Sequence, residues 1–285
     1  MDATTSTLID LALAEDIGTG DVTSRYFVPE DREARGMIVA KADGVIAGVE
    51  IAEEVFKRVD EKTMVKVLLE SGTHVSNRAY VMEVKGKARS LLTAERVALN
   101  FLQRLSGVAT KTRQFVALTE GTGACILDTR KTTPGWRALE KGAVVAGGGT
   151  NHRIGLYDRA MVKDNHLVAE GGIEDLQRAI LRLRKEQPEV EVELEADRLD
   201  QVEAFLKLEG VDYILLDNMD NESLRKAVAM RDGKGPLLEA SGGVNLTTVA
   251  DIAKTGVNFI SVGAITHSAV ALDISLEFLD VENES

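Results

Sequence analysis

A short stretch of the sequence, residues 128–166, concentrates side chains suited to binding a strongly anionic ligand. Its seven basic residues are Arg130, Lys131, Arg137, Lys141, Arg153, Arg159 and Lys163. Its four acidic residues are Asp128, Glu140, Asp158 and Asp164, so the stretch carries +3 within a chain of net charge −12. Cations close to a run of three glycines at 147–149 predict a cleft that attracts a small, highly charged molecule. The alternative is a basic face exposed to solvent.

His152 lies three residues after Gly149, the last glycine of the run, and Arg153 follows it directly. Together with Arg130, these two residues could hold two carboxylates of one planar acid, because a guanidinium group binds a carboxylate through paired hydrogen bonds. A metal-binding role is not expected for His152, because no second His or Cys lies at ligand spacing.

Short apolar runs alternate with helical stretches after residue 121, which predicts repeated βα units around a parallel sheet. The runs are 124–127, 160–162, 190–194, 213–216, 237–238 and 259–262. Polar residues follow them, and Glu195, Asp217, Ser241 and Gly263 are separated by 22, 24 and 22 residues. In βα barrels the active site forms at these carboxyl ends of the strands. The cations and carboxylates of the region are therefore expected to meet there.

The last two strand ends carry small residues that predict a phosphate site. They are Ser241, Gly242 and Gly243, and Val262, Gly263 and Ala264. Glycine lets the backbone approach a phosphate, and a following helix, capped by Asn245 or Thr247, would offer free N–H groups. The alternative is that these glycines serve only tight turns.

Glu195 and Asp217 end adjacent predicted strands and face the basic cluster. This arrangement favours a polyphosphate bound with Mg²⁺, which prefers oxygen ligands and is often held by one or two carboxylates together with substrate phosphates. The carboxylates could also stabilise positive charge on a sugar carbon as a leaving group departs. Alternatively, they are ordinary carboxylates paired with lysines.

The first part of the chain has a mixed α+β pattern. A short helix is expected around Leu8–Leu13, strands at 37–41 and 64–69, and a helix at 91–105 that stops at Gly107. The expected fold class is α/β: an incomplete, TIM-like βα barrel at 113–267, with an N-terminal α+β domain at 1–112 that the tail 268–285 joins.

The bulk composition is that of a folded globular protein, with 285 residues, 44% hydrophobic and 28% charged. A pI near 5.0 argues against nucleic-acid or anionic-membrane partners. The single cysteine, Cys125, is expected in the core and fits a reducing compartment. No secretory signal or transmembrane run is found, so the sequence predicts a cytoplasmic protein.

Several motifs together resemble the quinolinate phosphoribosyltransferase family, also called carboxylating nicotinate-nucleotide pyrophosphorylase. The resemblance spans nearly the whole chain. It is carried by the segments 15–23 (EDIGTGDVT), 128–137 (DTRKTTPGWR), 147–155 (GGGTNHRIG), 163–166 (KDNH), 215–218 (LLDN), 239–243 (EASGG) and 262–267 (VGAITH).

The resemblance implies an enzyme of de novo NAD synthesis. Quinolinate would react with phosphoribosyl pyrophosphate (PRPP) to give nicotinate mononucleotide, pyrophosphate and CO2. It also implies site residues: Arg130, His152, Arg153 and Lys163 for the quinolinate carboxylates, Thr129 and Lys131 for the pyrophosphate, Glu195 and Asp217 for the Mg²⁺-bound ribose, and Ser241, Gly242, Gly243, Val262, Gly263 and Ala264 for the 5-phosphate.

The resemblance further implies a homodimer or hexamer, in which Arg96 reaches the site of the neighbouring subunit. In the expected mechanism, pyrophosphate leaves through an oxocarbenium-like state and decarboxylation follows, with Lys163 protonating or stabilising the carbon that loses CO2. Lys131, Lys163, Glu195 and Asp217 are the expected catalytic residues.

Three other functions stay open from the sequence. One is a paralogue that uses nicotinate or accompanies molybdate transport, although the surplus of carboxylate-binding cations favours quinolinate. Another is a Schiff-base barrel lyase with Lys131 or Lys163 as nucleophile. The last is a catalytically silent ligand sensor.

Overall fold

The computed structural model describes residues 1–163 and 172–279, and the chain divides into two compact units. Unit 1 comprises Met1–Arg113, Thr132–Gly148 and Ser268–Ser285, and unit 2 comprises Gln114–Lys131 and Gly149–His267. The segment 132–148, which the sequence analysis placed with the barrel, thus clusters with unit 1. Asp164, Asn165 and His166 of the KDNH motif lie outside the described residues.

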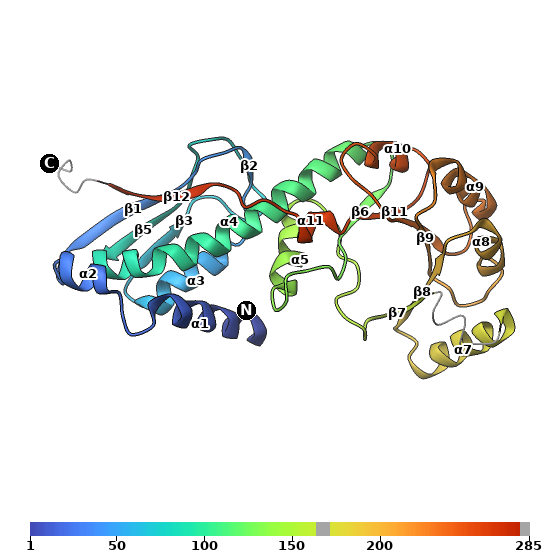
Figure 1. Ribbon diagram of the computed structural model, residues 1–285, viewed down its shortest axis with the longest axis horizontal. Helices are drawn as coiled ribbons and strands as arrows, with labels where there is room; N and C mark the ends of the chain where they lie inside the picture. Colours follow the sequence, from blue (N-terminus) through green and yellow to red (C-terminus); the bar gives the residue numbers. More distant parts are fainter. Residues whose placement is uncertain (164–171, 280–285) are drawn as a thin grey trace. The chain divides into compact units, whose positions relative to one another are not determined.

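Unit 1 contains a four-stranded antiparallel sheet in the order β12-β1-β5-β3 (Figure 1). Its strands are β1 (Glu33–Ala40), β3 (Met64–Val67), β5 (Tyr80–Lys87) and β12 (Ile274–Leu279), and a separate pair is formed by β2 (Gly44–Val45) and β4 (His74–Val75). Strand β12 comes from the end of the chain and pairs with β1, with Ile274 opposite Ala40. The strands expected at 37–41 and 64–69 are therefore confirmed.

The helices of unit 1 begin with α1 (Ala3–Ile17), α2 (Val22–Phe27) and α3 (Val49–Val59), and α5 (Arg137–Ala146) lies in the segment 132–148. Helix α1 ends at Gly18, whose φ of 52° is in the left-handed region that glycine adopts readily. Asp2 and Asp21 cap α1 and α2 by accepting backbone N–H groups of the first turn. The short N-terminal helix expected from the sequence is confirmed and is longer than its apolar pattern indicated.

Helix α4 (Ala88–Thr119) is 32 residues long, so the expected stop at Gly107 is wrong. The apolar face predicted for 91–105 is confirmed, because Leu91, Leu102 and the other members of this face are buried. Gly107 allows a close contact within the helix rather than ending it. A Cβ at this position would lie 2.1 Å from the carbonyl oxygen of Val270, so glycine allows the 270–271 segment to pack directly on the helix.

Unit 2 contains a six-stranded parallel sheet in the order β6-β11-β10-β9-β8-β7. The strands are β6 (Cys125–Leu127), β7 (Arg159–Val162), β8 (Glu191–Ala196), β9 (Tyr213–Asp217), β10 (Leu237–Ser241) and β11 (Phe259–Ser261). All six apolar runs are therefore strands. The strands follow chain order around the sheet, but β6 and β7 lie at its two edges. The sheet is thus an incomplete barrel, as expected.

Four helices connect successive strands of unit 2: α7 (Ile173–Glu186), α8 (Leu199–Phe205), α9 (Asn221–Arg231) and α10 (Val249–Ala253), and α11 (Ala264–His267) follows β11. In Figure 1, α7 to α10 lie along the outer side of the curved sheet. The apolar face of α7 is buried through Leu176 and Ile180, and its acidic first turn and basic last turn complement the helix dipole. These helices cover the outer face of the sheet and leave the carboxyl ends of the strands for the site.

Two local expectations in unit 2 are wrong. Helix α10 has Thr248 as its N-cap rather than Asn245 or Thr247, because Asn245 accepts the N–H of Thr247 and so closes the preceding turn. Cys125 is exposed rather than in the core, because it is the first residue of an edge strand.

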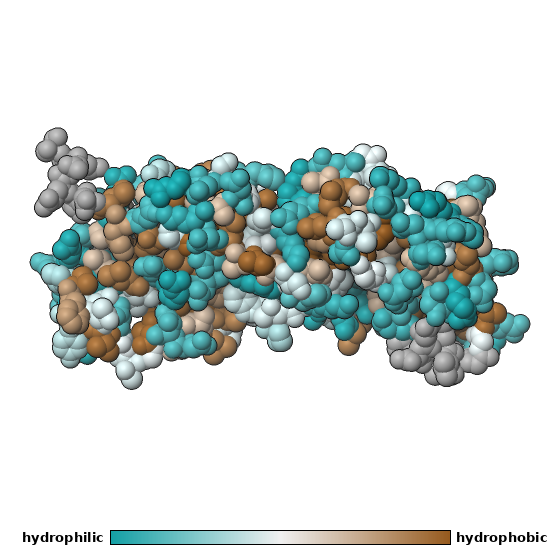
Figure 2. Space-filling view, turned by 45° about the horizontal axis from the view of Figure 1, so that its top comes forward, coloured by the Kyte–Doolittle hydropathy of each residue, from teal (hydrophilic) through white to brown (hydrophobic). Residues whose placement is uncertain are grey.

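The surface mixes polar and apolar side chains. The face drawn in Figure 2 is largely hydrophilic, with hydrophobic patches between the polar regions. Within 1–163 and 172–279, no helix combines the length and hydropathy needed to cross a membrane.

Candidate active site

A cavity of about 600 Å³ lies at the carboxyl ends of the strands of unit 2. Eleven of the fifteen expected site residues line it, namely Thr129, Arg130, Lys131, His152, Arg153, Lys163, Glu195, Asp217, Ser241, Gly242 and Gly243. They come from chain segments that are far apart in sequence, and the parallel sheet brings them together because all its strands end at the same edge. The basic residues 130, 131, 153 and 163 therefore face a concave site rather than a flat solvated surface.

The basic cluster is smaller than the sequence count suggested. Arg137 and Lys141 belong to α5 in unit 1, and Lys141 is buried there. The cause is the course of the chain, which leaves unit 2 after Lys131 and returns at Gly149. A charge count along the sequence could not show this change of unit.

Arg153 is held firmly at the cavity. Its Nη1 donates to the carbonyl oxygen of Arg159 at 3.0 Å, and its Nη2 lies 3.4 Å from the sulfur of Met161. Burial lowers the pKa of Arg153, and the positive charge of Arg130 lowers it further. An anionic ligand between these two arginines would relieve this repulsion, so the cavity favours a carboxylate or phosphate.

Lys163 and Glu195 form an ion pair inside the cavity lining, with Lys163 Nζ donating to Glu195 Oε2 at 2.6 Å. Asp217 ends the neighbouring strand β9 and accepts a hydrogen bond from the Asn218 side chain at 2.8 Å. Two carboxylates from adjacent strands thus reach the same cavity, and their oxygens are the donors that Mg²⁺ prefers. Asp217 fits this role directly, whereas Glu195 is also paired with Lys163.

The glycine-rich loop after β10 requires its glycines. Gly242 has a φ of 98°, and a Cβ there would lie 2.1 Å from Oδ1 of Asn218. The loop therefore packs its backbone directly against Asn218, which leaves the main chain of residues 241–243 at the cavity. This close backbone is the geometry that the phosphate prediction requires.

Val262, Gly263 and Ala264 are not among the cavity-lining residues, but they lie next to one of them. A Cβ at Gly263 would come within 3.0 Å of Lys131 Cδ, and Thr266 Oγ1 donates to the Lys131 carbonyl at 2.8 Å. The turn after β11 therefore packs against the Lys131 side chain and binds its carbonyl. Thr129 also holds Lys131 in place, because its Oγ1 accepts the Lys131 N–H at 3.0 Å.

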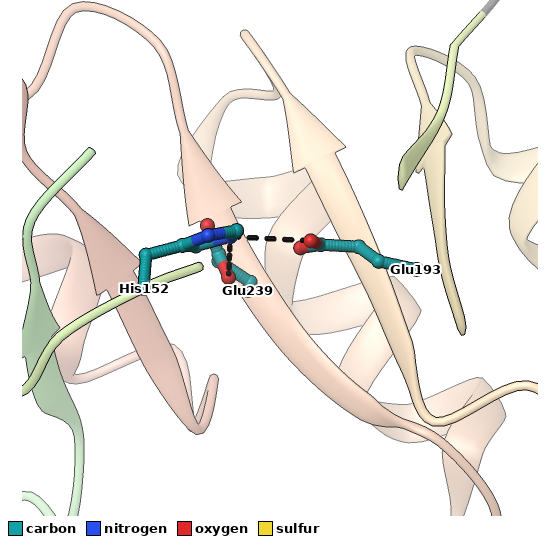
Figure 3. A group of neighbouring side chains, drawn as sticks. All are labelled: His152, Glu193 and Glu239. Atoms are coloured by element: carbon teal, nitrogen blue, oxygen red, sulfur yellow. Dashed lines mark ion pairs between the residues drawn. The ribbon is translucent and has the colours of Figure 1, made fainter. Parts of the chain in front are cut away.

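His152 is buried, and both of its ring nitrogens contact protein groups. Nδ1 accepts the Arg153 N–H at 2.7 Å, while Nε2 lies 3.1 Å from Glu193 Oε2 and 3.5 Å from Glu239 Oε2 (Figure 3). The ring therefore lines the cavity with both nitrogens turned to protein groups, whereas the expectation from the sequence was that it binds a substrate carboxylate directly.

The protonation of His152 follows from these contacts. Burial lowers its pKa, but hydrogen bonds to Glu193 and Glu239 and their charges outweigh burial and raise it to about 9. A ring with protons on both nitrogens could not accept the Arg153 N–H, so full protonation and the 2.7 Å contact exclude each other. The short contact favours the ring with its single proton on Nε2.

Glu193 and Glu239 are the residues that the sequence analysis missed. Both are fully buried, and Ser261 donates to Glu239 from the next strand. Burial and the charge of Glu193 raise the pKa of Glu239. Burial also acts to raise the pKa of Glu193, but its interaction with His152 and the charge of Arg159 outweigh burial and lower it. The available signal was position: each lies two residues before an expected site residue, Glu195 or Ser241, and so shares its face of the strand.

Arg96 lies outside this cavity. It is an exposed residue of α4 in unit 1, so unit 2 does not itself supply it. Among the described residues, the cavity is formed from unit 2 alone.

The fold and the site together define a class of protein: an α/β-barrel enzyme that binds anionic substrates between cations, carboxylates and a glycine-rich loop at the strand ends. Comparison with known families specifies it further. Residues 108–277 match the family model described as quinolinate phosphoribosyl transferase, C-terminal domain, and residues 21–106 match the model of the N-terminal domain of that family.

Individual relatives agree with this result. The chain is 43% identical to the chloroplastic carboxylating nicotinate-nucleotide pyrophosphorylase of Arabidopsis thaliana, over 96% of this chain and 82% of that one. It is 44% identical to the corresponding Mycobacterium leprae protein, over 93% and 94%. The structure of the Francisella tularensis nicotinate-nucleotide pyrophosphorylase superposes with a TM-score of 0.90 at 38% identity, covering 97% of this chain and 96% of that one.

The chain therefore belongs to the quinolinate phosphoribosyltransferase family. The expected activity is confirmed at this level: it is a decarboxylating quinolinate phosphoribosyltransferase activity of NAD biosynthesis. The family uses PRPP as its second substrate.

Proposed function

We propose that quinolinate binds in the cavity of unit 2 with its two carboxylates between Arg130, Arg153 and Lys163. The repulsion between Arg130 and Arg153 supports this assignment, because a dianion placed between them converts an unfavourable contact into two favourable ones. His152 also lines this end of the site and accepts the Arg153 N–H. Arg96 of a second copy of the chain completes it, so that the active form is a homodimer or a hexamer.

PRPP occupies the opposite side of the same cavity. Lys131 and Thr129 bind the pyrophosphate, and the backbone of Ser241, Gly242 and Gly243, continued by the turn 262–264, binds the 5-phosphate. Asp217 and Glu195 hold the ribose and the Mg²⁺ that accompanies PRPP. Mg²⁺ would neutralise charge on the departing pyrophosphate.

The reaction joins these two ends. The lone pair of the pyridine nitrogen forms a bond to C1 of the ribose, while the C1–O bond breaks and its electron pair leaves with pyrophosphate. The carboxylates of Asp217 and Glu195 stabilise the positive charge that develops on the sugar. Positioning by the two anchored ends supplies much of the rate, because the reacting atoms are held in line.

Decarboxylation follows on the quaternised ring. The bond from C2 to its carboxylate breaks, CO2 departs, and the electron pair stays on C2 next to the positive nitrogen until a proton is delivered there. Lys163 is placed for this step, because its ammonium group lies among the carboxylate-binding cations and is held by Glu195 at 2.6 Å. This ion pair between a quinolinate-binding lysine and a ribose-binding carboxylate is the observation that carries the proposal.

The direct test is an assay of the purified protein with PRPP and Mg²⁺. Quinolinate should give nicotinate mononucleotide and an equal amount of CO2, whereas nicotinate should give no nucleotide. Turnover of nicotinate alone would transfer the protein to the nicotinate-using relatives. A substrate adduct trapped by borohydride on Lys131 or Lys163 would instead favour the Schiff-base lyase.

The assembly has its own test. Arg96→Ala and Lys163→Ala should each be inactive alone, because each removes a group from every site. When the two variants are unfolded and refolded together as dimers, some mixed sites regain both groups, and about a quarter of the wild-type activity should return. A mixture that stays inactive would show that Arg96 acts within its own chain.

The cellular location is also part of the proposal. We expect a cytoplasmic enzyme, because one cysteine fits a reducing compartment. Some plant relatives are designated chloroplastic or mitochondrial, which describes those proteins.

A further inference from the structure

Two buried glutamates, Glu193 and Glu239, have no assigned part in substrate binding. They lie on β8 and β10, the strands on either side of β9, and each has 0% exposed surface. Their carboxylates approach the same atom, Nε2 of His152, at 3.1 and 3.5 Å (Figure 3). Burying two carboxylates is unfavourable unless charged or hydrogen-bonding partners compensate. Their shared partner is therefore a clue to their purpose.

His152 connects these carboxylates to the cavity. Its ring Nδ1 accepts the backbone N–H of Arg153 at 2.7 Å, and the backbone N–H of His152 donates to Asp128 Oδ1, also at 2.7 Å. The ring orientation and the main chain of residues 152 and 153 are thus fixed by the same set of contacts. Rotation of the ring would remove the Nδ1 contact, so whatever holds Nε2 also holds Arg153.

We propose that Glu193 and Glu239 are positioning residues for quinolinate: by accepting the Nε2 proton of His152, they direct Nδ1 to the Arg153 N–H and so keep the Arg153 side chain at the cavity. This inference rests on the proposed function, in which Arg153 binds a quinolinate carboxylate. It assigns the two glutamates an indirect effect that is specific to the quinolinate end of the site.

The surrounding charges fit this role. Glu193 lies 3.6 Å from Arg159 Nη1, and Arg159 is also bound by Glu191 at 2.7 Å and lies over the Tyr213 ring at 4.0 Å. The negative charge of Glu193 favours the charged form of Arg153, against burial and Arg130. Glu193 therefore supports Arg153 in two ways, through the His152 ring and through its charge, and Glu239 supports it through the ring.

The kinetic test uses Glu193→Gln and Glu239→Gln, which keep side-chain volume while removing the charge. Each should raise the KM for quinolinate about tenfold, as loss of an orienting partner does in other sites, and leave the KM for PRPP near the wild-type value. An equal rise in both KM values would overturn the proposal, because it would indicate a general loss of structure.

Glu191→Gln is the matched control. It removes a carboxylate partner of the same Arg159 from the same strand, two residues from Glu193, but Glu191 has 43% of its side chain exposed and does not contact His152 in the described geometry. It should leave the KM for quinolinate unchanged. If Glu191→Gln matches Glu193→Gln, the effect passes through Arg159 and the His152 assignment is overturned.

A second readout is independent of turnover. The Nε2 proton of His152 should give a slowly exchanging imidazole N–H signal in NMR spectra, assigned by its absence in His152→Gln. The signal should shift or broaden in Glu193→Gln and Glu239→Gln and persist in Glu191→Gln. An unprotonated Nε2 in the wild type would overturn the inference, even if the enzyme turned over quinolinate normally.

These measurements also distinguish a failure of the positioning role from a failure of the proposed function. If the wild type failed to turn over quinolinate, the proposed function would fail, whereas the NMR result and calorimetric quinolinate binding by the variants would still decide the role of the glutamates. The residue types of the cluster could also ligate a metal ion. One equivalent of a transition metal in the purified protein, lost in Glu239→Gln, would overturn the positioning role in favour of a metal site.

Discussion

Each unit buries glutamate completely, but the two surroundings differ. In unit 1, Glu140 accepts hydrogen bonds from Arg104 Nη2 at 2.7 Å, Thr133 Oγ1 at 2.8 Å and Thr133 N at 3.0 Å. In unit 2, the carboxylates of Glu193 and Glu239 both approach His152 Nε2, at 3.1 and 3.5 Å. Ser261 donates to Glu239, and Arg159 Nη1 lies 3.6 Å from Glu193.

The difference separates a structural carboxylate from a functional one. Glu140 has donors on both oxygens, so its burial is well compensated and it joins the loop after Lys131 to helix α4. Two carboxylates that share few donors are a less stable arrangement, and such arrangements persist where they serve a site. We therefore expect changes in unit 2 to act on catalysis and changes at Glu140 to act on stability.

Lys163→Ala should give the largest effect. It removes a proposed carboxylate ligand and the partner of Glu195, so kcat/KM for quinolinate should fall about a thousandfold, with little change in the unfolding midpoint. Steady-state kinetics and CO2 release would measure this loss. Normal turnover would refute the assigned role of Lys163.

Lys207→Ala is its control. Lys207 also pairs with a glutamate of unit 2, Glu203 at 2.8 Å, but both side chains are largely exposed. Activity and stability should both stay close to wild type, because exposed pairs contribute little.

Glu140→Ala should have the next largest effect, on the free energy of unfolding. It leaves the Arg104 guanidinium and the Thr133 N–H without their acceptor, which should cost about 3 kcal/mol. Denaturant unfolding would measure it. Glu53→Ala, which breaks an exposed pair with Lys57, should cost far less. If Glu140→Ala lost much of its kcat and none of its stability, Glu140 would not be the structural carboxylate that distinguishes unit 1 from unit 2.

The sequence was sufficient for much of unit 2. Strand positions followed from apolar runs, and the cavity followed from the rule that parallel strands end at one edge, so Glu195, Asp217 and Ser241 were found together. Glu193 was missed because alternation of Glu with apolar residues in 191–195 also fits a half-exposed strand. Only the covering of both faces in the folded unit shows that this residue is buried.

Other errors arose from contacts between distant segments. Gly107 predicts a helix end locally, but the helix continues because glycine admits Val270, more than 160 residues later. Arg137 and Lys141 are close in sequence to the site cations and nevertheless belong to the other unit. The neighbours of His152 Nε2 are Glu193 and Glu239, which no local pattern around His152 contains.

Gly242→Ala should reduce stability by an intermediate amount, and it compares two glycines of unit 2, one packed against a side chain and one in open space. The new Cβ would meet the Asn218 side chain and the backbone would hold an unfavourable positive φ, so the variant should lose about 2 kcal/mol and bind PRPP less tightly. Gly121→Ala is matched, because Gly121 also has a positive φ but open space around its Cβ position. A larger loss in Gly121→Ala would show that contact with Asn218 is unimportant.

Asp21→Ala should give the smallest effect, in unit 1. Asp21 caps α2 by accepting the Ser24 N–H at 2.9 Å and also accepts the Thr93 hydroxyl at 3.1 Å, so its loss should cost about 1 kcal/mol at neutral pH. Hydrogen bonds from the Ser24 side chain and N–H lower the pKa of Asp21 below 3.8. Its stabilisation is therefore complete above pH 3.8 and is lost as the pH falls through the lower folded-state pKa.

The difference in unfolding free energy between the wild type and Asp21→Ala should accordingly shrink as the pH is lowered toward 3. Asp21→Asn can still cap the helix but has no charge to lose, so its difference from Asp21→Ala should depend much less on pH. Asp220 caps α9 in unit 2 by accepting the Ser223 N–H, and within residues 1–163 and 172–279 it accepts no hydrogen bond from a second helix, so Asp220→Ala should cost less than Asp21→Ala. An equal cost at both caps would mean that the Thr93 hydrogen bond adds no stability, and that the motif around Asp21 acts only as a local helix start.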